Sequence, residues 1–522
     1  MKNVEDIYPL SPLQQGILYH TLHEREFSMY FEIITWVIEG EVHVEAYERA
    51  WQRAVDLHPV LRSSFVWEGV DEPLQVVRRR AKLPMTHLDW RGAGPAEREA
   101  RLESLFAEER RRGFDLMKPP LMRVTLVRTG EASYRFVWCY HHGLIDGWSC
   151  SLIFNDVFAA YEALCRGAEP RLAAPRPFAE YIDWVRRQDM GAAESYWRRT
   201  LKGFTAPTPL GVEGGAGPRA EAAADSKSYR EQVLRLSAGV TGELTRLARR
   251  RQLTLNTVCL GAWAVLLSRY SGEEDVVLGV AVSGRPPMLA GVERMVGMLV
   301  NTLPTRVRVE PDRELLPWLE ELQRGQVELR QYEYSPLVRV HGWSEVQRNT
   351  PLFETVLSFE NHPIDYSLLE RDERARLRDA VHHHTATGIP VNLTVEPGEE
   401  LQVKIFYDFG RVDDDAVGRM LRHFARLLES VAEDPGRRLS ELPLLTDAER
   451  RLLHDWNRTG ADYPLARPLH SFVEAQAART PEAVAVVFGH ERLTYAELDG
   501  RADRLARRLR RLGVGPDVLV GV

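Results

Sequence analysis

The sequence predicts a mixed α/β protein built from about three folded units. Domains have about 150 residues on average, so 522 residues correspond to roughly three domains. Runs with the two-residue alternation of strands stand beside runs with the period of helices, which indicates both kinds of element. After a polar stretch the pattern restarts near Leu469, which indicates a separate unit at the C-terminal end.

The first clear helix carries a regular set of apolar residues: Tyr47, Ala50, Trp51, Ala54 and Val55. The spacing of i, i+3, i+4, i+7 and i+8 puts all five side chains on one buried face. The helix is expected to end near His58-Pro59, because a residue that precedes proline avoids helical geometry.

A hairpin is expected next in the chain. Residues 122–126 and 134–140 alternate between apolar and other side chains, with a glycine turn between them. The second strand runs directly into His141-His142, and apolar residues at helical spacing follow over 153–164. Residues 141–147 are therefore expected in a strand-to-helix loop, where side chains and free backbone N–H groups come together.

Composition and charge narrow the class of protein. The chain is 44% hydrophobic and 27% charged, as soluble globular proteins are. Its net charge of −7 argues against a nucleic-acid binder, which carries a basic surface. Four cysteines without a C-x-x-C pair predict reduced thiols in a cytoplasmic protein. The N-terminus lacks a signal-peptide core, and no run approaches the roughly 20 apolar residues that span a bilayer, so no membrane partner is expected.

The segment His141-His142-Gly143-Leu144-Ile145-Asp146-Gly147 is the strongest candidate for chemistry. A histidine ring accepts or shares a proton near neutral pH. Asp146 fits two roles, since it can orient that ring or pair with an arginine and hold the loop shut. Gly147 lets a backbone N–H approach a developing oxyanion. The alternative is a structural histidine pair that is hydrogen-bonded to the backbone.

No metal site is predicted. Neighbours on a strand point to opposite faces, so His141 and His142 do not chelate one ion well. The run His382–His384 is expected in a solvated loop. The basic runs Arg110–Arg112 and Arg249–Arg251 are expected on exposed helix faces.

Six motifs, in order, resemble those of the condensation domains of nonribosomal peptide synthetases. They are YPLSPLQQGILYH, HPVLRSSF, HHGLIDGWS, YIDWV with SYWRRTLKG, MVGMLVNTLP, and PLFETVLSFEN. The resemblance covers about residues 5–445, and six ordered matches are far more specific than any one of them. The tail, with Leu493-Thr494-Tyr495-Ala496-Glu497-Leu498, resembles the start of an adenylation domain.

The resemblance implies a fold similar to chloramphenicol acetyltransferase, with two related lobes in a V and a central tunnel. The lobes are expected over 1–175 and 176–445, a linker over 446–466, and a partial α/β adenylation subdomain over 467–522. Residues 211–228 are expected in a surface loop. The adenylation family's phosphate-binding loop and catalytic lysine would lie beyond Val522, so no amino-acid adenylation is expected.

The resemblance also implies the activity. A donor thioester and an acceptor amine would arrive on the phosphopantetheine arms of two carrier proteins, one from each side of the tunnel. The amine attacks the thioester carbonyl, and the lengthened chain moves to the acceptor carrier. The chain itself is expected to bind no cofactor, and the remainder of the module, an adenylation domain and a carrier, is a further expected partner. Met1 stands just before the first motif, which fits a donor carrier on another polypeptide and fits an engineered start equally well.

The same resemblance assigns the site residues. His142 is the central residue, either as a general base or as a hydrogen-bonding group that positions the amine, and the sequence leaves both roles open. His141 is expected to support the loop, and Gly147 to offer its backbone N–H to the thioester oxygen. Asp146 is expected to pair with Arg285, which stands in AVSGRPP.

Details of the motifs narrow the subtype. Arg62, in HPVLRSSF, is expected near the tunnel with a structural role. Cyclising relatives replace the histidine pair by aspartate and epimerising relatives follow a carrier protein, so amide formation is favoured. The opening motif and NTLP after MVGMLV favour a D-configured or modified donor. Two alternatives stay open: a domain that also modifies its donor, for example by dehydration, and a non-catalytic docking platform for carriers or tailoring enzymes.

Overall fold

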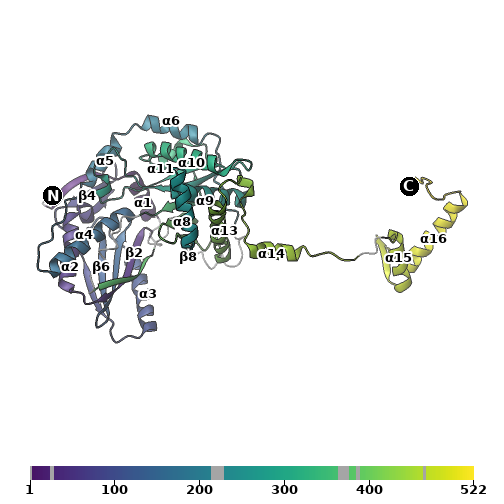
Figure 1. Cartoon of the computed structure of the whole chain (residues 1–522), viewed down its shortest axis with the longest axis horizontal. Coiled ribbons are helices and arrows are strands. Elements are labelled where there is room, and N and C mark those ends of the chain that lie inside the picture. Colours follow the sequence, from purple (N-terminus) through teal and green to yellow (C-terminus); the bar gives the residue numbers. More distant parts are fainter. Residues whose placement is uncertain are drawn as a thin grey trace. The chain divides into compact units, whose positions relative to one another are not determined.

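A computed structural model describes residues 3–23, 29–212, 229–361, 375–383, 388–462 and 466–521, of which 375–383 are described as backbone (Figure 1). The contacts divide the chain into two compact units, the first ending at Thr446 and the second beginning at Asp447. The first unit contains three sheets and the second contains one two-stranded sheet, within the ranges described. Both units mix helices with strands.

The first large sheet has the strand order β12-β2-β7-β6-β5. Its strands are β2 (Phe31–Gly40), β5 (Met85–Asp89), β6 (Met122–Gly130), β7 (Ser133–His141) and β12 (Ala375–His383). The predicted hairpin is confirmed, because β6 and β7 are antiparallel neighbours. The alternation of apolar side chains in these strands gives the sheet two buried faces.

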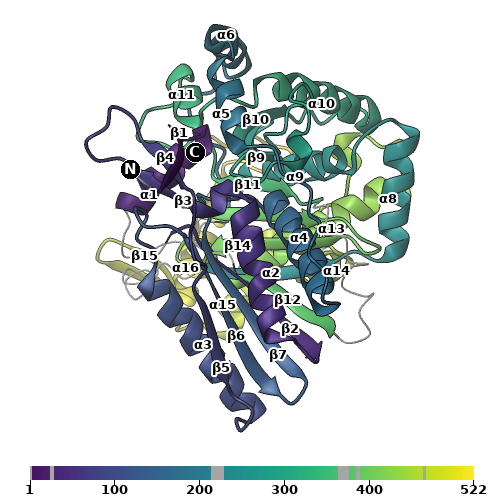
Figure 2. The ribbon, with the colours of Figure 1, turned by 90° about the vertical axis from the view of Figure 1, so that its left-hand side faces the viewer.

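Helices cover both faces of this sheet. Trp36, Phe136 and Trp138 pack under α2 (Val44–Leu57) and α4 (Gly147–Cys165), which lie side by side in Figure 2. On the other face, α3 (Pro95–Arg112) packs against Phe31, Ile33 and Val137. The predicted end of α2 is confirmed, since His58 is its C-cap.

Strand β12 comes from late in the chain but completes the first sheet by pairing antiparallel with β2. His382 and His383 lie opposite Ile34 and Ile33 in this pairing. The predicted loop is therefore wrong for these two histidines, because ladder hydrogen bonds fix their backbone as strand; His384 lies outside the described residues. A segment from the second expected lobe thus belongs to the sheet of the first.

The second large sheet has the order β10-β9-β11-β13-β14-β8. Its strands are β8 (Tyr229–Arg235), β9 (Asp275–Val282), β10 (Asn301–Arg308), β11 (Thr355–Phe359), β13 (Val391–Glu396) and β14 (Gln402–Asp408). One face packs on α8 (Ala238–Arg250), α9 (Leu255–Ser271), α10 (Leu315–Leu329) and α13 (Asp414–Glu433). The other face packs on α5 (Phe178–Arg186), α6 (Met190–Thr200) and α11 (Leu337–Trp343). Of the predicted loop 211–228, residues 213–228 lie outside the described ranges.

A small sheet, β1-β4-β3, holds the opening of the chain. Its strands are β1 (Val4–Pro9), β3 (Ser63–Val66) and β4 (Leu74–Arg78), and helix α1 (Pro12–His23) follows β1. Short 3-10 turns occur at Pro59–Arg62, Val292–Arg294, Arg330–Tyr332 and Leu439–Glu441. These pieces bring the first motif next to the histidine loop.

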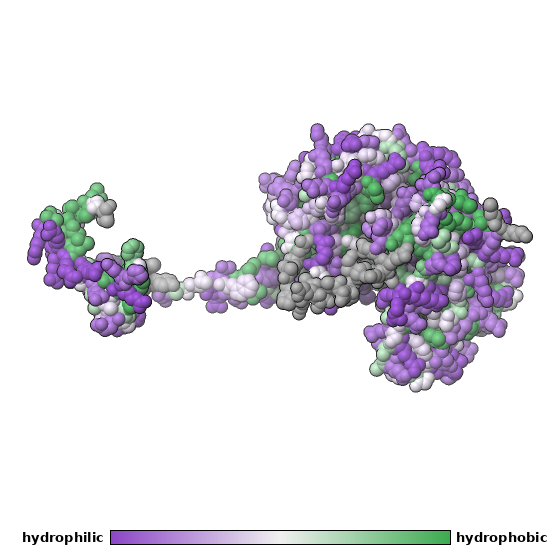
Figure 3. Space-filling view, turned by 180° about the vertical axis from the view of Figure 1, so that it is seen from behind, coloured by the Kyte–Doolittle hydropathy of each residue, from purple (hydrophilic) through white to green (hydrophobic). Residues whose placement is uncertain are grey.

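The second unit contains α14 (Asp447–Trp456), α15 (Leu469–Arg479), β15 (Val484–Phe488), β16 (Glu491–Thr494) and α16 (Tyr495–Arg511). From Leu469 on, the order is helix, strand, strand and helix. The segment expected as a linker, 446–466, contains the helix α14. Apolar side chains such as Phe488 and Leu519 are exposed here, and Figure 3 shows apolar surface on this unit.

The basic runs differ in their surroundings. Arg111, Arg112 and Arg249–Arg251 are exposed, as predicted. Arg110 is half-buried on α3, and burial lowers the pKa of its guanidinium, so the predicted exposure is wrong for this residue. None of the described helices is long and apolar enough to cross a membrane.

Candidate active site

The histidine loop joins β7 to α4, in the predicted strand-to-helix position. His141 is the last residue of β7, and Asp146 is the N-cap of α4. The Asp146 Oδ1 atom accepts from the Ser149 N–H at 2.8 Å, which satisfies one of the N–H groups that open the helix. The loop is thus fixed at one end by a strand ladder and at the other by a helix cap.

His141 is buried with both ring nitrogens engaged. Its Nδ1 accepts from the Gly143 N–H at 3.1 Å. Its Nε2 lies 3.3 Å from the Thr21 hydroxyl, which donates its own proton to the Ile17 carbonyl and therefore accepts from Nε2–H. Burial, with a further contribution from His142, lowers the pKa of His141 to about 3. These contacts describe a neutral ring that holds the loop from inside.

This burial predicts a pH dependence of stability. The pKa of His141 is about 3 in the folded chain and about 6.5 in an unfolded one, so the unfolded chain binds more protons between these values. The free energy of unfolding contributed by this ring is present above about pH 6.5 and is lost as the pH falls toward about 3. His141→Gln, which does not titrate, should lose less unfolding free energy than the parent chain between about pH 7 and about pH 5. Urea unfolding at both values measures this, and equal losses would contradict a buried neutral ring.

His142 is oriented differently and is half-buried. Its Nδ1 lies 3.0 Å from the Ile145 carbonyl, which only accepts, so Nδ1 carries the proton. The neutral ring then holds its lone pair on Nε2. Its main-chain N–H donates to the Tyr30 carbonyl at 2.8 Å. His142 is therefore held at two points and keeps a hydrogen-bond acceptor at the far end of its ring.

Asp146 and Arg285 form a buried bidentate ion pair. The Arg285 Nη1 and Nη2 atoms donate to Asp146 Oδ2 at 2.9 Å and to Oδ1 at 3.1 Å. The side chains of Arg285 and Asp146 are 6% and 3% exposed. Burial alone would raise the pKa of the Asp146 carboxyl, but Arg285 and the bonds from Ser149 outweigh it and leave that pKa below its ordinary value. Asp146 is therefore a buried carboxylate.

The ion pair extends into a network that joins the start of α4 to residues 297–300. Asp146 Oδ2 also accepts from the N–H groups of Leu299 and Val300, at 3.1 and 3.2 Å. The Ser149 hydroxyl donates to the Gly297 carbonyl at 2.9 Å and accepts from the Gly297 N–H at 3.0 Å. A Cβ at Gly297 would collide with the Phe178 ring, so only glycine fits there. The start of α4 is thereby fastened to the segment that precedes β10.

Gly147 is the first residue of α4. At this position a backbone N–H has no carbonyl partner within the helix, and it lies at the positive end of the helix dipole. The structure thus gives Gly147 the kind of N–H that can bind an oxyanion.

Arg62 lies just beyond the end of α2 and is 4% exposed. Its guanidinium donates to the carbonyls of Val55, Asp56 and Arg78 and to the Glu5 carboxylate at 2.9 Å. These contacts tie α2 to β1 and β4, which is a structural task. None of these partners belongs to the histidine loop. The contacts of Arg62 therefore do not support the expectation that it lies near a tunnel.

Gln14 was not predicted from the sequence as a site residue. It is buried in α1, and its Nε2 donates to the Gly143 carbonyl at 2.8 Å and to Gln75 Oε1 at 2.9 Å. Its Oε1 accepts from the Ser11 N–H at 2.9 Å. The signal was present, because Gln14 stands three and four residues before the buried Ile17 and Leu18 and so shares their face. The first motif thus supports the loop directly.

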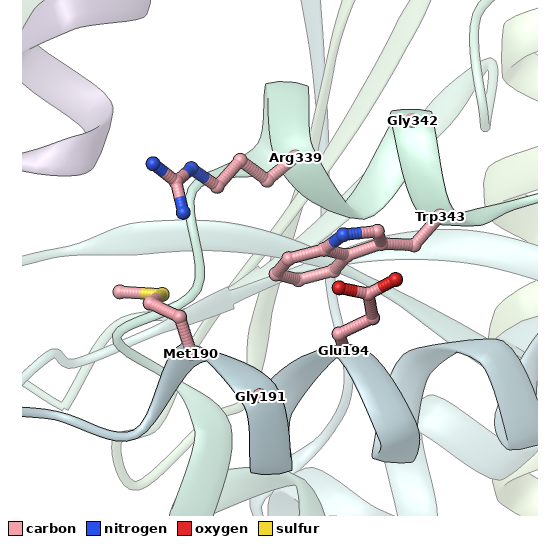
Figure 4. A pocket seen from close by; sticks show the side chains of 6 residues that line it. All are labelled: Met190, Gly191, Glu194, Arg339, Gly342 and Trp343. Atoms are coloured by element: carbon pink, nitrogen blue, oxygen red, sulfur yellow. The ribbon is translucent and has the colours of Figure 1, made fainter.

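An open groove of about 410 Å³ lies elsewhere, between α6 and α11. Figure 4 shows the Trp343 ring and the Glu194 carboxylate on opposite walls of it, and its lining contains none of the predicted site residues. In the described ranges, no three His, Cys, Asp or Glu side chains are grouped closely enough to hold a metal ion.

Comparison with known families identifies the family to which the chain belongs. The model for the condensation domain matches residues 4–454, and the model for AMP-binding enzymes matches residues 473–522. The chain belongs to the condensation domain family. Condensation domains of nonribosomal peptide synthetases catalyse peptide-bond formation, and residues 473–522 are part of an adenylation domain.

The relatives of this condensation domain are large synthetases. One of the subunits of the linear gramicidin synthase of Brevibacillus parabrevis is 45% identical over 522 residues, which is 100% of this chain and 7% of that protein. Bacitracin synthase 3 of Bacillus licheniformis is 35% identical over 523 residues, which is 99% of this chain and 8% of that protein. The chain therefore spans less than a tenth of these curated relatives.

Solved structures of condensation domains share the fold. A mutant of the starter condensation domain of rhizomide synthetase, in complex with C8-CoA, has a TM-score of 0.70 at 22% identity, covering 84% of this chain and 98% of that one. A four-domain nonribosomal peptide synthetase bound to AMP and glycine has a TM-score of 0.74 at 19% identity, covering 98% of this chain and 39% of that one. The predicted α/β fold, with a partial adenylation domain at its end, is confirmed.

Proposed function

We propose that this condensation domain joins a donor acyl or peptidyl thioester to the amine of an acceptor aminoacyl thioester. Both substrates arrive on the phosphopantetheine arms of carrier proteins, and the chain binds no cofactor of its own. The observation that carries the proposal is the contact between His142 Nδ1 and the Ile145 carbonyl, which leaves the lone pair of the neutral ring on Nε2. The N–H of Gly147, at the start of α4, follows five residues later in the same loop.

In the proposed reaction, the acceptor amine forms a C–N bond to the thioester carbonyl, and its N–H donates to His142 Nε2 as it attacks. The carbonyl oxygen gains charge and accepts from the Gly147 N–H. When the intermediate collapses, the C–S bond breaks, and the amine's proton ends on the departing thiol. Because thioesters are reactive and amines are good nucleophiles, holding the two together supplies much of the rate.

The remaining residues hold this geometry. Asp146, Arg285, His141 and Arg62 are structural in this proposal, since hydrogen bonds to other groups of the protein hold each side chain in place. The proposed lobes are 1–175 and 176–445, with a linker over 446–466 and the adenylation fragment over 467–522. The described cysteines carry free thiols, which suits a reducing cytoplasmic location.

An assay with two loaded carriers tests the proposal. The full chain is mixed with a donor-loaded and an acceptor-loaded carrier, and intact mass follows the acceptor carrier. We expect amide product that requires both carriers, and a faster reaction with a D-configured than with an L-configured donor. A product lighter by one water would reveal donor dehydration. Carrier binding without product, across several pairs, would overturn the proposal in favour of a docking platform.

A further inference from the structure

Tyr30 has a backbone conformation that tyrosine rarely adopts. Its φ is +60°, in the left-handed region, where bulky side chains are uncommon. Two other non-glycine residues in the described ranges have positive φ, Gln252 after α8 and Asp517 near the C-terminal end. Tyr30 differs from them because its carbonyl accepts a hydrogen bond from the histidine loop. Such outliers persist where the surrounding structure enforces them, and they gather at functional sites.

Tyr30 ends the strand ladder at the point where the loop begins to turn. Phe31, the first residue of β2, lies opposite His141, the last residue of β7. The Tyr30 carbonyl then accepts from the His142 N–H at 2.8 Å, one step beyond that pair. An extended residue at position 30 would continue β2 alongside the loop. The left-handed residue instead turns the chain at once, so pairing stops with His142.

The hydrogen bond from the His142 N–H to Tyr30 is one of two contacts that fix His142. The His142 ring is held through Nδ1 on the Ile145 carbonyl, and its main chain is held through N–H on the Tyr30 carbonyl. Two fixed points on one residue leave its ring little freedom to rotate or shift. If the second point moved, Nε2 would move with it.

We propose that Tyr30 is a positioning residue: its left-handed backbone sets the peptide group of His142 and thereby the direction of Nε2. The proposal rests on the proposed role of His142. It concerns the backbone of Tyr30, and it assigns no contact with substrate to the ring.

A matched pair of substitutions separates backbone from ring. Tyr30→Asn and Tyr30→Val both remove the ring, but asparagine tolerates the left-handed region and a β-branched residue does not. In the two-carrier assay we expect Tyr30→Asn to keep kcat within about threefold of the parent value. We expect Tyr30→Val to lower kcat by about tenfold or more at unchanged KM for the loaded carriers, since small misplacements of a reacting group cost up to about 10²-fold.

The two variants also define what would overturn the proposal. Equal losses in both would assign the effect to the ring, and full activity in Tyr30→Val would show that the backbone conformation is not needed. Should Tyr30→Val fail to fold by near-UV circular dichroism, Tyr30→Ala compared with Tyr30→Gly repeats the test, because glycine adopts positive φ freely. Glycine is then expected to retain the rate that alanine loses.

A readout independent of activity keeps this proposal distinct from the proposed function. In the full chain labelled with ¹³C-histidine, the His142 ring signal is assigned by its loss in His142→Gln. We expect Tyr30→Asn to leave that signal in place and Tyr30→Val to shift it. If the parent chain forms no amide with any carrier pair, the proposed function fails, while the shift still tests the role of Tyr30. An unshifted signal in folded Tyr30→Val would overturn that role.

Discussion

Replacing Asp146 with alanine is expected to lower the free energy of unfolding by about 3–5 kcal/mol, a large share of what holds a typical domain together. The change leaves the Arg285 guanidinium buried without the carboxylate that pairs with it. It also removes the acceptor of the Leu299 and Val300 N–H groups. Denaturant unfolding followed by circular dichroism measures the loss, and expression as aggregate would be its extreme form.

Two controls compare the loss of this buried ion pair with the loss of an exposed one. Glu97→Gln breaks the exposed pair with Arg101 on α3 and should cost about 0–1 kcal/mol. Arg285→Met combined with Asp146→Leu should cost less than either single change, because no charge is then left uncompensated. A single Asp146→Ala variant as stable as Glu97→Gln would refute the structural role of the network.

The ion pair also predicts how stability responds to acid. The pKa of Asp146 is lowered in the folded chain, so the unfolded chain takes up the proton first. The stabilisation is present above the unfolded value of about 3.9 and is lost as the pH falls through the folded value. Asp146→Asn should therefore show a flatter loss of unfolding free energy below about pH 4 than the parent chain, as measured by urea unfolding across that range.

Replacing His142 with alanine is expected to lower the rate of amide formation by about 10²-fold or more while leaving the fold intact. Alanine removes the Nε2 acceptor, and the half-buried side chain contributes little to the core. Single-turnover measurements with both carriers pre-loaded give the rate of the chemical step. A loss below about threefold would show that His142 neither moves a proton nor places the amine.

Glutamine at the same position distinguishes the two roles. It keeps a hydrogen-bond acceptor but does not take a proton, so recovery of most of the rate in His142→Gln indicates positioning. A loss as deep as that of His142→Ala indicates general base catalysis. Glu97→Gln, an exposed substitution on α3, is the control and should preserve the rate.

The local pattern predicted much of the first sheet. The hairpin and α2 followed from alternation and helical spacing, because Phe136, Trp138 and Trp51 each face one continuous core. The Asp146–Arg285 pair came from the family resemblance, since no spacing links two residues so distant in the chain. The contacts of His141 and His142 then distinguish two rings that look alike in sequence.

Other features could not be predicted from the local sequence. Strand β12 is rich in charged and histidine residues, and it is a strand because β2 offers it a backbone ladder. Arg110 lies partly inside because α3 packs its face on the sheet. The left-handed turn at Tyr30 contradicts residue preference, so only the surrounding structure explains it.

The late arrival of β12 has a consequence for how the chain is made. Until that strand is synthesised, β2 is an open edge, and its sequence FEIITWVIEG is β-branched, aromatic and free of proline. Such an edge is a template for pairing with other chains and for aggregation. During synthesis, the β2 edge therefore stays unpaired until residues 375–383 are made and pair with it.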